Sequence, residues 1–153
     1  MDLLLWRHAE AEEAADGMDD LERALTKRGE KQAHRAAQWL DRQLPDGVRV
    51  LCSPARRTEQ TVLALGRKYK LRAELAPGGG PADLLSLVQW PDGKSTVLVV
   101  GHQPMLGQAI AQLLGLAEPE CAVKKGAIWW LRSRQRQPGA RATIVTVLPP
   151  ERL

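Results

Sequence analysis

Five short runs of apolar residues along the chain have the length and composition of β-strands. The first is a short apolar run that suits a central strand, and the third is the most strand-like of all. The last two lie close together and are expected to form a terminal strand pair. The five predicted strands are residues 2–6, 48–52, 95–101, 127–132 and 142–148.

Apolar residues recur at helical spacing between these strands. Over 25–44, alanines and leucines repeat three, four and seven residues apart, which indicates an amphipathic helix. Ser53 and Pro54 are residue types that cap and open helices, so a second helix is expected from Ser53 to about Tyr69. Shorter helices are predicted over 82–90 and 104–115, and a basic segment over 133–141 is expected to link the terminal strands.

This alternation of strands and helices predicts an α/β fold, in which parallel strands form a central sheet and helices cover both of its faces. The expected architecture is a three-layer α/β/α sandwich with a mostly parallel sheet. The chain has 153 residues, no internal repeat and no linker that would divide it. We therefore expect a single domain over 1–153.

Composition narrows the class of protein without naming a function. With 44% hydrophobic and 26% charged residues, the chain resembles an ordinary globular protein. No apolar run reaches the roughly 18 residues of a transmembrane helix, and no basic segment precedes the first apolar run. We expect neither a membrane span nor a secretory signal, and a cytoplasmic location. Cys52 and Cys121 are isolated, so free thiols are expected rather than a disulfide.

The net charge of +4 is unevenly distributed. Residues 1–20 hold seven carboxylates and one arginine, a net charge of −6, which leaves +10 for residues 21–153. The positive charge of residues 21–153 would attract nucleic acid, an anionic membrane or a phosphorylated partner. Charge alone does not indicate which of these three the protein binds. Base stacking would need aromatic side chains, but there is one Tyr, no Phe, and five Trp in contexts that favour core positions. We therefore expect no nucleic-acid or membrane partner.

Basic and imidazole side chains follow three of the predicted strands at the point where each one ends. They are Arg7 and His8 after the first strand, Ser53, Arg56 and Arg57 after the second, and His102 after the third. In open α/β sheets, ligands bind beyond the carboxyl ends of the strands. Guanidinium groups bind phosphate oxygens in pairs of hydrogen bonds, and a helix N-terminus favours an anion. The three strand ends together predict a site for a phosphoryl group.

Four sequence elements resemble the motifs of a known superfamily. They are RHA (7–9), similar to an RHG signature, LTKRGEKQA (25–33), SPARRTEQT (53–61) and VVGHQP (99–104). In this order and spacing they resemble the histidine phosphatase (phosphoglycerate mutase-like) superfamily over most of the chain. The short length, together with the forms GHQPMLG and KKGAI, is most similar to the SixA-type phosphohistidine phosphatases.

The resemblance implies a role for each residue at the strand ends. His8 would be the nucleophile that attacks phosphorus and forms a phosphohistidine intermediate, so its other ring nitrogen should donate to a backbone carbonyl or a similar acceptor. The phosphoryl oxygens would be held by Arg7, Arg57 and His102. Arg23 would be a further arginine of the phosphate pocket, with a salt bridge to the acidic loop over 10–20 as the alternative. The resemblance implies no metal and no cofactor.

The chain departs from the family pattern at the proton donor. Larger members protonate the leaving group with a carboxylic acid, but the corresponding segment here, APGGGPADLL (76–85), has no Glu before its glycines. The two candidates are Asp83, which would otherwise cap a helix, and Glu10, which would otherwise brace its loop. Imidazole, with a reference pKa of about 6.5, leaves far more easily than an alkoxide. The missing carboxylate therefore favours phosphohistidine as the substrate.

The leading hypothesis is a monomeric phosphohistidine phosphatase that acts on a phosphorelay or phosphotransfer protein. A small-molecule or broad-specificity phosphomonoesterase of the same superfamily is the alternative. A non-catalytic module that binds phosphate or nucleic acid is a further one. A metallohydrolase built on His8, Glu10 and His102 is disfavoured, because the paired arginines would repel a cation.

Overall fold

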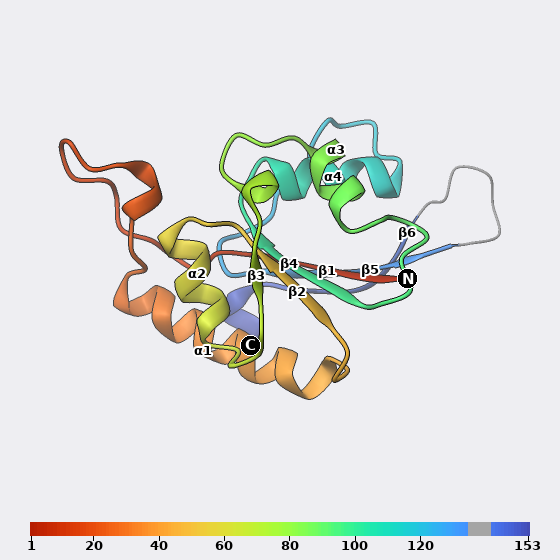
Figure 1. Cartoon of the computed structure of the whole chain (residues 1–153), viewed down its shortest axis with the longest axis horizontal. Coiled ribbons are helices and arrows are strands. Elements are labelled where there is room, and N and C mark those ends of the chain that lie inside the picture. The colour runs from red at the N-terminus through yellow and green to blue at the C-terminus, as the bar shows by residue number, and fades with distance from the viewer. Residues whose placement is uncertain (135–141) are drawn as a thin grey trace.

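The computed structural model describes residues 1–134 and 142–153 (Figure 1). Its strands are β1 Asp2–Arg7, β2 Arg49–Cys52, β3 Lys70–Leu71, β4 Val97–Gly101, β5 Ile128–Ser133 and β6 Ala142–Leu148. Its α-helices are α1 Lys27–Gln43, α2 Arg56–Leu63, α3 Pro81–Leu87 and α4 Met105–Leu114. Single 3-10 turns are η1 Asp20–Glu22, η2 Ala73–Leu75 and η3 Pro150–Arg152.

The strands form one six-stranded sheet in the order β3-β2-β4-β1-β5-β6. The strands β1 to β4 run parallel, and β5 and β6 run antiparallel to their neighbours at one edge. The predictions of a mostly parallel sheet and of a terminal strand pair are therefore confirmed.

Helices cover both faces of this sheet, with α3 and α4 above it and α1 and α2 below it in Figure 1. Alternate side chains of a strand point to opposite faces, which explains how β1 contributes to both layers. Leu5 packs in the cluster that contains Leu106 of α4, and Trp6 packs in the cluster that contains Leu40 of α1. The predicted three-layer α/β/α architecture is confirmed.

The second helix begins later than the sequence predicted. Its first residue is Arg56, and the N-cap residue is Ala55, which makes no side-chain capping bond. Ser53 does not cap this helix. Its backbone N–H instead donates a hydrogen bond to the carbonyl of Val100, which continues the pairing of β2 with β4, and its hydroxyl contacts His102. The residue type expected to start a helix is thus used at the end of a strand.

The same helix also ends earlier than expected, at Leu63 rather than near Tyr69. The chain then turns through Gly66, whose φ of 71° lies in the left-handed region that favours glycine. It returns as β3, Lys70–Leu71, a two-residue strand that the sequence did not predict.

Several smaller expectations concern side chains and the last loop. Both cysteines are free, and all five tryptophans are at least half-buried, Trp6 completely. Of the segment expected to link the terminal strands, residues 135–141 lie outside the described residues, so this link stays a prediction. Within 1–134 and 142–153, no helix is long and apolar enough to cross a membrane.

Candidate active site

Three neighbouring parallel strands end at the same edge of the sheet, because β1 and β2 both pair with β4. Backbone hydrogen bonds to β4 continue one residue beyond the ends of β1 and β2. The N–H of His8 donates to Gly101 at 3.1 Å, and the N–H of Ser53 donates to Val100 at 3.0 Å. The rings of His8 and His102 consequently lie with their centroids 5.4 Å apart. The structure thus brings together the histidines that lie far apart in the sequence.

His8 is held as a neutral imidazole with one free ring nitrogen. Its Nδ1 lies 2.7 Å from the carbonyl oxygen of Ala9, so Nδ1 carries the hydrogen and Nε2 keeps its lone pair. The pKa of His8 is lowered to about 4, mainly by burial and then by the charges of Arg7 and Arg57, while the bond to Ala9 acts in the opposite direction. The expected bond from the other ring nitrogen to a backbone carbonyl is present.

His102 is oriented by a serine hydroxyl. Its Nε2 lies 2.7 Å from Oγ of Ser53, which also accepts a long bond of 3.4 Å from the N–H of Ala55. In the tautomer in which the serine hydroxyl donates to Nε2, the hydrogen of His102 lies on Nδ1. Burial, followed by the charge of Arg57, lowers the pKa of His102 to about 3, so this ring is also neutral at pH 7.

Two arginines, the half-buried Arg7 and the buried Arg57, lie beside the histidines. Arg7 donates from Nη1 to the carbonyl of Val123 at 2.7 Å, and Arg57 donates from both terminal nitrogens to Asp20. Burial, and then the charge of Arg57, lowers the pKa of Arg7. Within the described part of the chain, Nε of Arg7, Nε of Arg57 and Nδ1 of His102 are buried without a hydrogen-bond partner. Such a set of donors suits a tetrahedral oxyanion.

Arg23 is bound to the acidic loop that precedes it. Its Nε donates to the carbonyl of Glu12 at 2.7 Å, and its Nη1 lies 3.2 Å from Oδ1 of Asp20. This is the salt bridge that the sequence analysis gave as the alternative to a phosphate contact. Its charge also contributes to the lowered pKa of His8, so the electric field of Arg23 reaches the histidine.

Glu10 lies on the loop after β1, with its carboxylate turned towards α1. Its Oε2 lies 3.7 Å from Nε of Arg28, and its backbone N–H donates to Gln32 at 3.0 Å. These contacts brace the loop against α1. Across the described residues, no hydrogen bond or ion pair joins Glu10 to His8 or His102.

Asp83 is exposed in the first turn of α3. The expectation that it caps this helix is wrong, because the N-cap residue is Gly80 and Pro81 begins the helix. No group of three or more His, Cys, Asp or Glu side chains within 1–134 and 142–153 is placed to hold a metal ion.

Three polar residues support the site in roles that the sequence motifs do not indicate. Asp20 is one of several carboxylates in its loop, and its position three residues before Arg23 permits an ion pair. Ser53 has the residue type of a helix cap, but its hydroxyl contacts His102. Thr61, in the predicted SPARRTEQT element, also supports the site, because its hydroxyl accepts the N–H of Ala9 at 3.1 Å.

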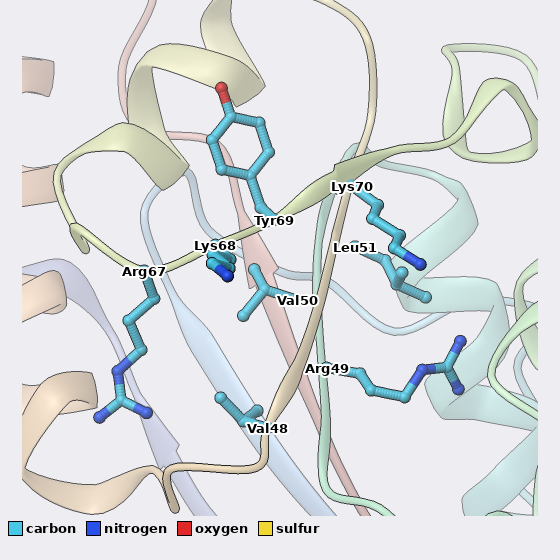
Figure 2. A pocket seen from close by; sticks show the side chains of 8 residues that line it. All are labelled: Val48, Arg49, Val50, Leu51, Arg67, Lys68, Tyr69 and Lys70. Carbon is cyan, nitrogen blue, oxygen red and sulfur yellow. The ribbon is translucent and has the colours of Figure 1, made fainter.

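A groove of about 530 Å³ lies elsewhere, at the edge of the sheet (Figure 2). Residues 48–51 at β2 and 67–70 leading into β3 line it. Its lining includes neither His8 nor His102, and neither Arg7 nor Arg57. This groove is therefore separate from the candidate active site.

Comparison with known proteins agrees with this geometry. The model of the histidine phosphatase superfamily (branch 1) matches residues 3–78. The phosphohistidine phosphatase SixA homolog of Haemophilus influenzae is 31% identical over 134 residues, covering 78% of this chain and 80% of that protein. Phosphohistidine phosphatase SixA of Escherichia coli is 34% identical over 121 residues, covering 74% of each chain. A solved structure of the protein histidine phosphatase SixA complexed with tungstate has a TM-score of 0.78 and 29% identity, over 98% of this chain and 97% of that one. The chain is therefore an enzyme of the histidine phosphatase superfamily, and it belongs to the SixA-type group within it.

Proposed function

We propose that this enzyme hydrolyses phosphohistidine on a phosphotransfer protein, with His8 as the nucleophile. The observation that carries the proposal is the state of His8, a buried neutral imidazole whose Nδ1 hydrogen is bound to the carbonyl of Ala9. Its Nε2 is left with the lone pair that attack on phosphorus requires.

In the first step, Nε2 of His8 attacks phosphorus in line with the leaving group. The P–Nε2 bond forms while the P–N bond of the substrate breaks, and the substrate imidazole leaves with the electron pair and takes a proton from solvent. In the second step, water attacks the same phosphorus, the P–Nε2 bond breaks and phosphate is released. The water proton passes to solvent, and His8 regains its lone pair.

The hydrogen-bond donors around His8 would stabilise the charge on the transferring group. Arg7 and Arg57 supply a half-buried and a buried guanidinium group, and His102 supplies an N–H from Nδ1 in the tautomer in which Ser53 donates to Nε2. Phosphoryl transfer depends mainly on positioning and on such charge stabilisation. A relative's structure with tungstate, a tetrahedral oxyanion, supports the same assignment.

The surroundings of the two candidate proton donors favour a substrate with an easy leaving group. Glu10 pairs with Arg28, and Asp83 is exposed on α3. An alkoxide from a sugar or serine phosphate needs a proton, and general acids contribute about 10²- to 10⁴-fold to such steps. Imidazole, with a reference pKa of about 6.5, needs far less help. The names of the relatives, phosphohistidine phosphatases, support the same substrate class.

Transfer of label to the enzyme tests the nucleophile. A histidine phosphotransfer domain carrying ³²P is mixed with the parent enzyme, with His8→Ala, and with His34→Ala as a matched control, since His34 is exposed on α1. We expect label on the parent and on His34→Ala at early times, and none on His8→Ala. Equal labelling of His8→Ala, or turnover by that variant at the parent's rate, would exclude His8 as the nucleophile.

Comparison of substrates tests the leaving-group argument. The phosphorylated domain and p-nitrophenyl phosphate both release groups that need little protonation, whereas a phosphosugar releases an alkoxide. We expect kcat/KM for the phosphosugar to be about 10²- to 10⁴-fold lower than for the other two. Equal kcat/KM for the phosphosugar and the phosphorylated domain would indicate a broad-specificity phosphomonoesterase instead.

A further inference from the structure

We propose that Asp20 is a positioning residue that holds Arg57 in the geometry needed to bind the phosphoryl group and ties Arg23 to the same loop. The proposal rests on the proposed function, because it assigns how the oxyanion pocket of that reaction is kept in shape. Asp20 lies at the start of η1, on the loop between β1 and α1, and touches both arginines from one position.

Asp20 accepts hydrogen bonds from both terminal nitrogens of the Arg57 guanidinium group. The backbone carbonyl of Asp20 accepts from Nη1 at 2.8 Å, and its carboxylate Oδ2 accepts from Nη2 at 3.0 Å. Because the guanidinium group is planar, two hydrogen bonds to its terminal nitrogens restrict its rotation. Nε of Arg57 has no partner within the described part of the chain. Asp20 therefore holds the guanidinium through two of its five N–H groups, and Nε together with one N–H on each terminal nitrogen is not bonded to Asp20.

The charge of Arg57 also requires a partner such as Asp20. The side chain of Arg57 is 4% exposed, whereas that of Asp20 is 55% exposed. A buried cation without a counterion is costly, so the ion pair stabilises the position of Arg57 inside the pocket. Burial acts to raise the pKa of Asp20, but the bonds from Arg23 and Arg57 outweigh it, and the carboxylate stays ionised at pH 7.

The second carboxylate oxygen extends the same arrangement to Arg23. Oδ1 of Asp20 lies 3.2 Å from Nη1 of Arg23, whose Nε is bound to the carbonyl of Glu12 at 2.7 Å. Figure 1 shows that the loop carrying these residues projects from the body of the molecule before it returns to α1. Asp20 thus attaches a projecting loop to Arg57 of α2, which lies 37 residues away in the sequence.

A positioning role and a simple charge effect predict opposite results. If Asp20 only added negative charge beside the pocket, its removal would strengthen binding of an anion. If Asp20 holds the arginines in place, its removal weakens binding of the oxyanion and slows transfer. The variants are Asp20→Asn, which keeps the shape but loses the charge, and Asp20→Ala, which loses both. Asp16→Asn is the matched control, because Asp16 is an exposed carboxylate of the same loop.

The first measurement is tungstate binding by calorimetry, which needs no turnover. The second is kcat and KM with p-nitrophenyl phosphate, and thermal unfolding shows that each variant is folded. We expect both Asp20 variants to bind tungstate about 10- to 100-fold more weakly and to lose kcat/KM by a similar factor, as for loss of a hydrogen bond to a charged group. Asp16→Asn should match the parent.

Unchanged or tighter tungstate binding by folded Asp20→Ala would overturn the proposal. A parent enzyme that binds tungstate but hydrolyses neither p-nitrophenyl phosphate nor a phosphorylated phosphotransfer domain would instead overturn the proposed function. The tungstate comparison would still decide the role of Asp20 in that case.

Discussion

Replacing His8 by asparagine should make the protein more resistant to acid, although it removes the proposed nucleophile. His8 is 4% exposed, and burial lowers its pKa from 6.5 to about 4. In the unfolded chain, the imidazole binds a proton as the pH falls through 6.5, whereas the folded imidazole stays neutral until about pH 4. The unfolded state binds more protons in this window, so the free energy of unfolding falls as the pH falls.

The size of the effect follows from the difference in pKa. At pH 4.5, almost every unfolded His8 is protonated and most folded His8 is not, which lowers the free energy of unfolding by about 2–3 kcal/mol relative to pH 7.5. Asparagine does not titrate, and its amide can still donate to the carbonyl of Ala9. The pKa of His102 is lowered to about 3 and acts in the same direction, but this ring is present in both proteins.

Urea denaturation at pH 4.5 and pH 7.5 measures the effect in the parent, His8→Asn and His34→Asn. The loss of unfolding free energy between the two pH values should be about 2–3 kcal/mol smaller in His8→Asn than in the parent. His34 is exposed on α1, so His34→Asn should follow the parent. Equal losses in the parent and His8→Asn would refute the reasoning, because His8 would then titrate like an ordinary solvated histidine.

Three further predictions concern kinetics and packing. A protonated His8 cannot act as a nucleophile, and its pKa is about 4. We therefore expect kcat/KM to stay constant as the pH falls below 6.5 and to decline only near pH 4. A pH–rate profile with its midpoint near pH 6.5 would contradict this. Ser53→Ala removes the 2.7 Å contact that orients His102 and should lower kcat/KM about 10-fold; unchanged kinetics would show that other contacts orient the ring. Gly29→Ala would press a methyl group against the backbone carbonyl of Glu10 and should lower the free energy of unfolding by about 1–3 kcal/mol in urea denaturation. Gly47→Ala, which has open space around it, is the control, and equal stability of the two variants would contradict the close approach.

The central strands and the first helix could be predicted from the sequence, because they depend on local patterns. The apolar run of β1 and the alanine and leucine repeat of α1 each indicate one type of element without reference to the rest of the chain. Parallel strands place their carboxyl ends at one edge of the sheet. The convergence of His8, Ser53 and His102 therefore also followed from the sequence, once three strand ends were located.

The bounds of short elements depended on contacts that no local pattern contains. Ser53 has the chemistry of a helix cap, but its hydroxyl contacts His102, and α2 begins at Arg56 instead. β3 has only two residues and exists because it pairs with Leu51 and Cys52 of β2. Its own sequence, Lys70–Leu71, carries no strand signal.

The sequence by itself determined which residues lie at the strand ends, and the tertiary structure decided the state in which each is held. The lowered pKa of His8 reflects burial by the whole fold, which is not a property of the RHA motif. The bonds from Asp20 to Arg57 join a loop to a helix 37 residues later, and Glu10 faces Arg28 because α1 packs beside its loop. Such long-range contacts arise only when the layers pack together, so residue type and spacing do not specify them.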